Sequence, residues 1–269
     1  MVESFSISMI DSHCHLNCLN LAKYDGKLEG ALEAAKANGV EGFLCVCIDL
    51  EHFPEVLNIA KQYRNVKASV GLHPNEKEGE EPSVARLVNL ASDPDVVAIG
   101  ETGLDYYRTE GEISWQQERF RCHIQAAKQV HKPLIIHSRQ APQDTIRILQ
   151  EERAEEVGGV MHCFTENLSM AEEAIALGFY ISFSGIVTFK NAKSIQEVAK
   201  QLPLDKILIE TDSPYLTPDP YRSQPNEPAY VRYVAEKIAE LKKIELHEVI
   251  LTTTNNYKKL FINTISETI

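Results

Sequence analysis

Several features are missing from this 269-residue sequence. No apolar run approaches the roughly 20 residues that a membrane-spanning helix needs. The first ten residues, MVESFSISMI, lack the basic start and the apolar core of a secretory signal. The 6 cysteines include no Cys-x-x-Cys pair, and a chain of this length does not need disulfides for stability. These absences predict a cytoplasmic protein with reduced cysteines and no membrane partner.

Positive charge is also scarce, because 27 lysines and arginines stand against 39 aspartates and glutamates, a formal net charge of -12. A protein that coats nucleic acid by electrostatic attraction needs the opposite balance. That class of protein is therefore excluded, but an enzyme that acts on a phosphodiester is not. A bound metal ion can supply positive charge locally where the surface as a whole lacks it.

No Gly/Ser-rich linker, low-complexity tract or short internal repeat interrupts the chain, which favours a single domain over residues 1–269. Short β-rich segments alternate instead with segments of helical periodicity, and they cover residues 9–13, 42–48, 66–73, 96–102, 133–137, 158–164, 179–185 and 206–212. Such alternation predicts a parallel sheet covered by helices. Eight units in a chain of this length predict an α/β fold, a (β/α)8 TIM barrel. The alternative is an open doubly wound sheet, but no Gly-x-Gly-x-x-Gly loop follows the first β-rich segment.

Local signals support the helices between these segments. Apolar spacing predicts helices over 84–91 and 231–241. Ser169 and Glu172 have the spacing of a capping box, and Gly178 suits the end of the helix that they would begin.

Polar residues cluster where the β-rich segments end. They are His13 and His15 after the first segment, His73 after the third, Glu101 after the fourth, His137 after the fifth, His162 after the sixth and Asp212 at the end of the eighth. In a TIM barrel the carboxyl ends of the strands meet at one rim, where active sites are built. Each residue alone could be a hydrogen-bonded core residue, a helix cap or a turn former, but their coincidence at one rim indicates a site. The other four histidines, His52, His123, His131 and His247, fall in helical or loop segments and suggest no function.

The residue types indicate a metal site. Burying imidazoles and carboxylates without partners costs several kcal/mol each, and a divalent ion removes that cost. Six residues are the expected ligands: His13, His15, Glu101, His137, His162 and Asp212. One tetrahedral ion takes four ligands, whereas this number suits two ions about 3.5–4 Å apart with one bridging carboxylate. Because residues i and i+2 of a strand share a face, His13 and His15 are expected to hold one ion together while Cys14 faces away. The cofactor is therefore predicted to be two divalent ions, with Mg, Zn and Mn left open.

The segments DSHCHL, GLHP, GETGLDYY, PLIIHSR, MHCF and ETDSPYL, in that order, resemble the TatD family of metal-dependent deoxyribonucleases in the amidohydrolase superfamily. The resemblance covers Ile10 to about Phe261 and includes the NEP segment at 226–228 and TTTNNYKKLF near the end. It implies a (β/α)8 barrel, two divalent ions and hydrolysis of phosphodiester bonds, often as a 3′ exonuclease. By the same resemblance, one ion would be held by His13, His15, Glu101 and Asp212, and the other by Glu101, His137 and His162. Two places depart from the family pattern: Gln140 stands where an acidic residue is usual, and the loop 217–228 replaces one rich in arginine and glycine.

The residues themselves suggest catalytic roles. Asp212 can accept a proton from the attacking water, so it is the expected general base. Glu210, two residues earlier, is expected to orient a histidine ligand, with a buried ion pair as the alternative. His73 could bind phosphate or protonate the leaving oxygen.

Three further residues are candidates for substrate contact. Arg139 is the expected phosphate binder, because arginine matches phosphate oxygens bidentately, and the alternative is a pair with a nearby acid. Tyr106 and Tyr107 could stack on a base, although tyrosines after a strand are as often simple loop packing.

The sequence thus predicts a metal-dependent hydrolase that cleaves the phosphodiester bonds of DNA as a 3′–5′ exodeoxyribonuclease. Single-stranded DNA or 3′ ends are the expected substrates, and no obligate protein partner is expected. The alternative is hydrolysis of another ester or amide, in a small molecule or an aminoacyl-tRNA, on the same barrel. A barrel that binds metal or a partner without catalysis is a third reading, against which the intact Asp212 and the complete ligand set count.

Overall fold

The structure is a computed structural model that describes residues 8–79, 81–109 and 111–262. Eight parallel strands form one sheet in chain order. They are β1 (Met9–Cys14), β2 (Val40–Cys45), β3 (Val66–Val70), β4 (Val96–Asp105), β5 (Leu134–Arg139), β6 (Gly159–Met161), β7 (Phe179–Phe183) and β8 (Ile207–Ile209). The eight predicted segments are therefore confirmed as strands. The sixth and the eighth are shorter than expected, because residues 162–164 and 210–212 already lie in the loops that follow.

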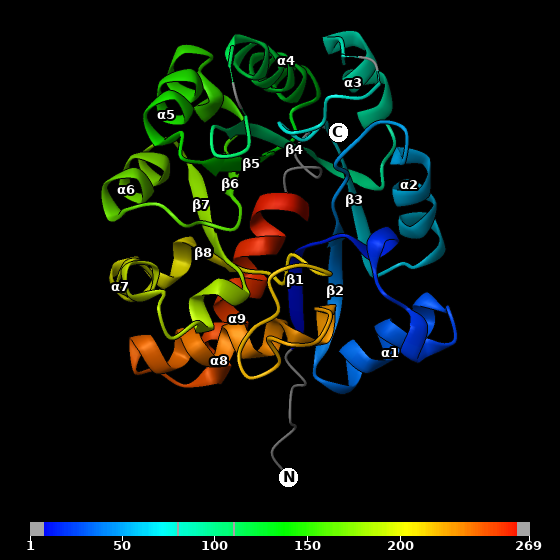
Figure 1. Cartoon of the computed structure of the whole chain (residues 1–269), viewed down its shortest axis with the longest axis vertical. Coiled ribbons are helices and arrows are strands. Elements are labelled where there is room, and N and C mark those ends of the chain that lie inside the picture. The colour runs from blue at the N-terminus through cyan, green and yellow to red at the C-terminus, as the bar shows by residue number, and fades with distance from the viewer. Residues whose placement is uncertain (1–7, 80, 110, 263–269) are drawn as a thin grey trace.

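Helices follow the strands and surround them, apart from the last helix, which lies at the centre of the ring (Figure 1). They are α1 (Leu28–Ala37), α2 (Phe53–Gln62), α3 (Val84–Ala91), α4 (Ser114–Val130), α5 (Pro142–Glu151), α6 (Leu168–Ala176), α7 (Lys193–Gln201), α8 (Val231–Lys242) and α9 (Leu246–Tyr257). Short 3-10 turns fill several connections, and α9 continues into a π-helical turn, Lys258–Ile262. In the part of the chain that the structure describes, no helix has the length and apolar character required to cross a membrane.

The last strand returns to the first. Ser12 Oγ donates to the Ile209 carbonyl at 2.9 Å, and the Asp212 amide donates to the His13 carbonyl at 2.9 Å. These contacts bring β8 and its following loop against β1, so the sheet curls into a nearly closed barrel. The predicted (β/α)8 architecture is confirmed, and the open doubly wound alternative is wrong.

Side chains alternate between two apolar layers along the strands. Leu44, Ile135, Val160, Tyr180 and Leu208 pack with one another inside the barrel. Their chain neighbours pack outward against the helices in a larger cluster. Both faces of the strands are buried, which explains why they are apolar almost without interruption.

The amino-terminal end of the barrel is closed by α9. Thr254 Oγ1 donates to the Ser8 carbonyl just before β1, and Asn256 Nδ2 donates to the Ile207 carbonyl at the start of β8. Tyr257 and Phe261 complete the inner apolar cluster from this side. Polar groups that need access to substrate therefore have only the carboxyl-terminal rim.

Two of the three local helix predictions are confirmed. The helices expected over 84–91 and 231–241 are α3 and α8. The capping box is wrong, because Asn167 rather than Ser169 accepts the hydrogen bond from the Met170 amide at the start of α6. Asparagine is an equally good cap, and the helix begins two residues earlier than the serine suggested. Gly178 follows the helix with φ 84, as its predicted position at the helix end requires.

Candidate metal centre

The six expected ligands meet at the carboxyl-terminal rim. They form the histidine–carboxylate cluster: His13, His15, Glu101, His137, His162 and Asp212. The donor atoms at this rim form three sets, and within each set they lie within 4.8 Å of one another. The sets are His13, Glu101 and His162; His13, His15 and Asp212; and Glu101 and His137 together with His73, which is outside the cluster. Glu101 and His13 each belong to two sets, so neighbouring sets share ligands.

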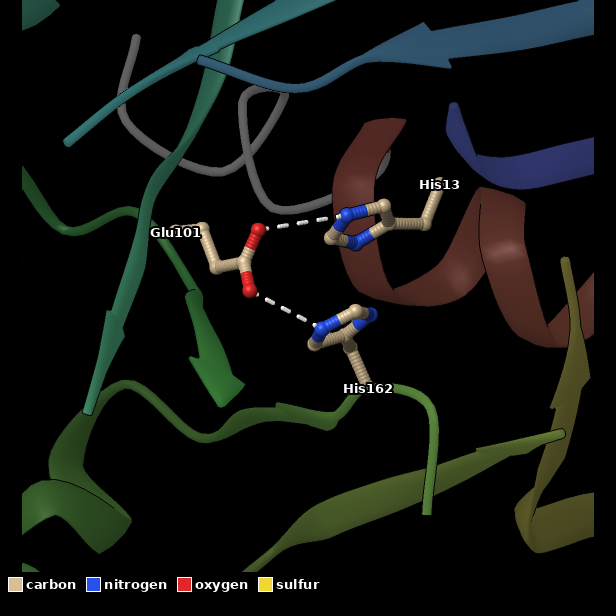
Figure 2. A group of neighbouring side chains, drawn as sticks. All are labelled: His13, Glu101 and His162. Atoms are coloured by element: carbon tan, nitrogen blue, oxygen red, sulfur yellow. Dashed lines mark ion pairs between the residues drawn. The ribbon is translucent and has the colours of Figure 1, made fainter. Parts of the chain in front are cut away.

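Glu101 lies at the centre of the cluster. Figure 2 shows its carboxylate between two imidazoles, with one oxygen facing His13 and the other facing His162. Oε1 lies 3.0 Å from His162 Nε2 and 3.0 Å from His137 Nδ1, and Oε2 lies 3.4 Å from His13 Nε2. Each oxygen thus faces a different part of the cluster, which is the arrangement that a bridging carboxylate needs.

Close approach of two strands brings Glu101 to His137. Gly103, which lies opposite His137 in the β4–β5 register, has φ 136. A Cβ at this position would lie 2.0 Å from the His137 carbonyl oxygen. Only glycine fits there, so the glycine of the GETGLDYY segment permits the contact between the two strands.

Asp212 completes the other side of the cluster. Its Oδ1 lies 3.2 Å from His15 Nε2 and 3.6 Å from His13 Nε2. Its backbone has φ 57, a left-handed conformation that aspartate tolerates better than most residues. Asn226 of the NEP segment holds this loop, since its Nδ2 donates to the carbonyls of Thr211 and Tyr215 on either side of Asp212.

The second nitrogen of three imidazoles has a partner outside the cluster. His162 Nδ1 lies 3.1 Å from Glu210 Oε1, and His15 Nδ1 lies 3.0 Å from the Val46 carbonyl. His137 Nε2 lies 3.1 Å from Asp105 Oδ2. Such contacts fix the ring orientation and the tautomer of histidines that ligate metals. Glu210 lies where an orienting carboxylate is expected, and Asp105 is a second such residue that the sequence reasoning missed.

The donor set fits divalent ions. His13 is buried, yet among the described residues neither of its ring nitrogens has a hydrogen-bond partner, and Glu210 Oε2 has none either. A buried imidazole without partners is costly unless a ligand is bound. Zinc ligands at about 2.0–2.2 Å in tetrahedral geometry lie roughly 3.3–3.6 Å apart, which matches the His13 distances to Glu101 and Asp212. The cluster therefore has both the chemistry and the spacing of a metal centre.

Charge is strongly redistributed inside the cluster. Burial opposes ionisation of Glu101, but the imidazoles around it, His162 first, hold the pKa of its carboxyl well below the usual range. Burial likewise opposes protonation of His162, but Glu101 and Glu210 raise its pKa well above the ordinary value. His13 stacks on His162 with ring centroids 3.8 Å apart, and burial and that neighbouring charge lower its pKa. His162 therefore holds its proton between the carboxylates of Glu101 and Glu210, and a metal ion would compete with that proton for the same position.

Asp212 is the second carboxylate of the cluster, and it remains ionised. Burial acts to raise its pKa, but the hydrogen bond from His15 and the charges of the neighbouring imidazoles lower it below the ordinary value. Its side chain is 13% exposed, whereas Glu101 is 3% exposed. Asp212 is therefore the carboxylate of the pair that substrate and water can reach.

His73 differs from the six ligands in its tautomer. Its Nδ1 accepts a hydrogen bond from the Asn75 amide at 3.0 Å, so the proton of the neutral ring is on Nε2. Nε2 lies 3.4 Å from Glu101 Oε1, and burial lowers the pKa of His73 to about 4. His73 thus presents an N–H donor toward the site rather than a lone pair for a metal.

A buried polar face of α4 holds the loops that carry these groups. We call it the α4 clamp, which consists of Gln116, Arg119 and His123. His123 Nε2 accepts from the Leu72 amide, and Arg119 Nη1 donates to the His73 carbonyl at 2.8 Å. Gln116 accepts from the Asp105 amide at 2.9 Å, which positions the residue after β4. His123, which suggested no function from its sequence position, is therefore part of the support of the site.

The expected substrate contacts lie around the rim but not all in one place. Arg139 stacks on the ring of Tyr107 at 4.0 Å, and among the described residues it makes no ion pair, so the predicted alternative of a pair with an acid is not seen. Tyr107 is 59% exposed and free to meet a ligand. The Tyr106 hydroxyl donates to Asp144 Oδ2 at 2.8 Å, so this ring is tied to α5. Gln140 makes a separate contact, in which its backbone amide donates to Glu166 Oε1.

A cavity of about 280 Å³ opens over the cluster. We call it the rim cavity, and its lining residues are His15, Ile48, His73, Asn75, Glu76, Glu101, Arg108, Asp212 and Tyr215. Arg108 and Tyr215 were missed from the sequence, although each follows a cluster residue within one of the resembling segments or just beyond it. Neither Arg139 nor Tyr107 lines this cavity.

Comparisons with known proteins agree with this geometry. Residues 10–262 match the model of a protein family described as TatD related DNase. The "Uncharacterized metal-dependent hydrolase YabD" of Bacillus subtilis (strain 168) is 45% identical over 254 residues, which are 94% of this chain and 98% of that protein. The "Uncharacterized metal-dependent hydrolase YcfH" of Escherichia coli (strain K12) is 44% identical over 94% of this chain and 95% of its own. The crystal structure of YJJV, a TatD homologue from Escherichia coli K12, superimposes with a TM-score of 0.88 at 29% identity, over 95% of this chain and 98% of that one.

Proposed function

This chain belongs to the TatD family of metal-dependent hydrolases, and we propose that it cleaves the phosphodiester bonds of DNA with two divalent ions, removing nucleotides from 3′ ends. The observation that carries the proposal is the place of Glu101, whose two oxygens face different imidazoles at the centre of the cluster. A carboxylate that bridges two ions suits the in-line displacement at phosphorus that many two-metal nucleases perform. The name of the matching family, TatD related DNase, supports DNA as the substrate.

The ligands would divide around Glu101. One ion would be held by His13, His15 and Asp212 and the other by His137 and His162, with Glu101 shared, as in the family pattern; His13 lies between the two groups, since it also forms a set with Glu101 and His162. The bound ions would make water a better nucleophile and neutralise negative charge that develops on the phosphate. A chain with a net charge of -12 needs such local positive charge to attract a phosphodiester at all.

The chain's own residues move the protons. Asp212, ionised and partly exposed, accepts a proton from the attacking water. His73 presents its Nε2 proton at the other side of the rim cavity, where it can hydrogen-bond the phosphate or the leaving 3′ oxygen. Glu210 and Asp105 hold the rings of His162 and His137 in orientation while this happens.

The test is a side-by-side turnover assay on purified, metal-reconstituted protein. A 5′-labelled single-stranded oligonucleotide should shorten stepwise from its 3′ end, whereas a panel of small carboxylic esters should turn over far more slowly. Asp212→Asn, purified in parallel, controls for contaminating nucleases, because a contaminant would cleave in both preparations. Intact DNA together with rapid ester hydrolysis would contradict the proposal and favour the hydrolase of another ester.

Metal content tests the two-ion part separately. Elemental analysis after reconstitution should give about two divalent ions per chain, because six donors exceed the four that one tetrahedral ion takes. A stoichiometry that never exceeds one ion would contradict the bridging role of Glu101. Repeating the analysis with Mg, Zn and Mn identifies which ions the site retains.

A further inference from the structure

The rim cavity contains more than the residues of the metal centre. Arg108 and Tyr215 line it together with His15, His73, Glu101 and Asp212. Arg108 follows β4 and Tyr215 follows β8, so the two side chains reach the cavity from different strands. Neither has a part in the chemistry described so far, so their presence beside the reacting groups needs another explanation.

Arg108 is a cation without a carboxylate partner. Most arginines with described contacts, such as Arg119, Arg121 and Arg147, pair with acidic side chains. Within the described residues Arg108 forms no ion pair, and it is the only arginine or lysine that lines the rim cavity. Its amide donates to Asp105 Oδ1 at 2.9 Å, which fixes the turn and leaves the guanidinium unengaged. In a chain of net charge -12, an unpaired guanidinium at a reaction cavity suits an anionic ligand.

Tyr215 presents an aromatic surface to the same cavity. Its side chain is 52% exposed, and its ring lies 6.0 Å from the His15 ring. The Nδ2 of Asn226 donates to the Tyr215 carbonyl, which fixes the backbone of this segment.

We infer that the rim cavity is a binding site for a single terminal nucleotide, in which Arg108 binds the phosphate and Tyr215 stacks on the base. The inference rests on the proposed function, since it names how that site recognises a nucleic acid end. Arginine binds phosphate oxygens bidentately, and an aromatic ring accepts any base by stacking. The cavity of about 280 Å³ is close to the lower limit of roughly 300 Å³ for pockets that enclose a small molecule, so it suits one nucleotide rather than several.

This assignment moves phosphate recognition from Arg139 to Arg108. Arg139 lies outside the lining of the cavity, and one face of its guanidinium is covered by the Tyr107 ring at 4.0 Å. Tyr107 is the chain neighbour of Arg108, so the Arg139–Tyr107 pair lies beside the cavity. It is placed to meet the next nucleotide of a longer strand, while the unit that is removed contacts Arg108.

The test measures binding of three small probes by calorimetry to the full-length, metal-loaded protein. Thymidine 5′-monophosphate carries both phosphate and base, 2-deoxyribose 5-phosphate lacks the base, and thymidine lacks the phosphate. Arg108→Ala should weaken both phosphate-bearing probes about ten- to a hundredfold, the range for a charge-assisted hydrogen bond, and leave thymidine unchanged. Tyr215→Ala should weaken only the probes with a base, by about tenfold, whereas Tyr215→Phe should bind like wild type.

Arg64→Ala is the matched control, because Arg64 is an exposed arginine in the turn before β3, at the opposite end of the barrel. It removes the same charge and should bind all three probes like wild type. Arg108 and Tyr215 are exposed, so circular dichroism and metal content should be unchanged in their variants. Equal phosphate affinity in Arg108→Ala and Arg64→Ala would overturn the role of Arg108. An equal loss of both phosphate probes in Tyr215→Ala would overturn the base stack, and a wild-type protein that binds no thymidine monophosphate at millimolar concentration would overturn the whole inference.

The binding assay separates this inference from the proposed function. A protein that binds the monophosphate through Arg108 but leaves DNA intact would contradict the proposed function and support the nucleotide site. A protein that degrades DNA with the same KM in wild type and Arg108→Ala would support the proposed function and contradict the site. In the supporting case, the loss in Arg108→Ala appears in KM rather than in kcat, because Arg108 holds the substrate and moves no proton.

Discussion

Two groups of buried polar side chains lie next to each other at the carboxyl-terminal end of this barrel, and they differ in how completely the chain satisfies them. In the α4 clamp, every side-chain nitrogen and oxygen of Gln116, Arg119 and His123 has a hydrogen-bond partner. In the histidine–carboxylate cluster, both ring nitrogens of His13 lack one among the described residues. Buried polar groups that complete one another stabilise a structure, whereas groups left incomplete indicate a missing ligand.

The difference extends to charge. The α4 clamp contains one charged side chain, Arg119, whose partners are Glu81 and two backbone carbonyls. The cluster brings two carboxylates and four imidazoles together, and their protonation depends on one another. The clamp therefore holds loops in place without a ligand, and the cluster is complete only with one.

The largest effect is expected from a change inside the cluster that leaves its ligands in place. Asp212→Asn keeps an oxygen for a metal but cannot accept a proton at neutral pH. Hydrolysis should fall roughly a hundred- to ten-thousandfold, the range for loss of a general base, while metal content stays as in wild type. Turnover at saturating metal and elemental analysis check this. Near-wild-type turnover would show that Asp212 is not the base.

Metal removal should distinguish the two regions by stability. With the free ion at about 1,000 times its Kd, binding stabilises the folded chain by roughly 4 kcal/mol, which a chelator should remove. Glu101→Gln should abolish that response, because the central carboxylate of the cluster is gone. Arg119→Lys in the clamp should keep it. Thermal unfolding with and without chelator measures both, and a full metal response in Glu101→Gln would contradict the central role of this residue.

The α4 clamp should make the free energy of unfolding depend on pH, through His123. Burial lowers the pKa of His123 to about 4, below the ordinary value of 6.5. Between these two pH values the unfolded chain binds more protons than the folded one, so stability falls as pH falls from 6.5 toward 4. The contribution is complete above pH 6.5 and its loss amounts to roughly 3 kcal/mol. Denaturant titrations of wild type and His123→Gln should show a stability difference that shrinks by this amount, and a difference independent of pH would contradict a neutral, buried His123.

The smallest effect is expected from a conservative change in the clamp. Arg119→Lys keeps the charge, but one ammonium cannot reach Glu81 and the carbonyls of His73 and Glu76 in the same geometry. The loss should be about 1–2 kcal/mol in the free energy of unfolding. Metal content should be unchanged, because Arg119 contacts the backbone of His73 and none of the six ligands. Loss of bound metal in this variant would mean that the clamp and the cluster form one unit.

The sequence was informative about the barrel and the ligands for the same physical reason. Nearly continuous apolar segments that alternate with helical segments predict parallel strands, and the carboxyl ends of such strands meet at one rim of the barrel. A polar residue at the carboxyl end of a buried strand, such as His137 in the second half of β5 or His162 directly after β6, is therefore brought to the rim by the fold alone. This is why all six expected ligands lie within one cluster.

The helices and loops were less predictable. Gln116, Arg119 and His123 lie on one face of α4, but sequence spacing does not say whether a polar face is exposed or buried. Asp105 follows Glu101 by four residues. The β4–β5 register pairs it with Arg139, and its side chain reaches back to Nε2 of His137 on the same face. Packing between separate elements brings such partners together, and no local sequence pattern encodes that packing.

The choice between two arginines shows most clearly what the tertiary structure decided. From the sequence, Arg139 was the natural phosphate binder, because it lies two residues beyond His137 on one strand and shares its face. In the structure the Arg139 guanidinium stacks on the Tyr107 ring. Arg108, from the turn after β4, lines the rim cavity instead. The direction of a side chain beyond the end of a strand depends on the conformation of its turn, here set by Asp105 and Gln116. The sequence by itself determined which strand ends would meet and which metal-binding groups they carry. The packing of loops against α4 decided which side chains line the rim cavity, because those contacts join residues far apart in the chain.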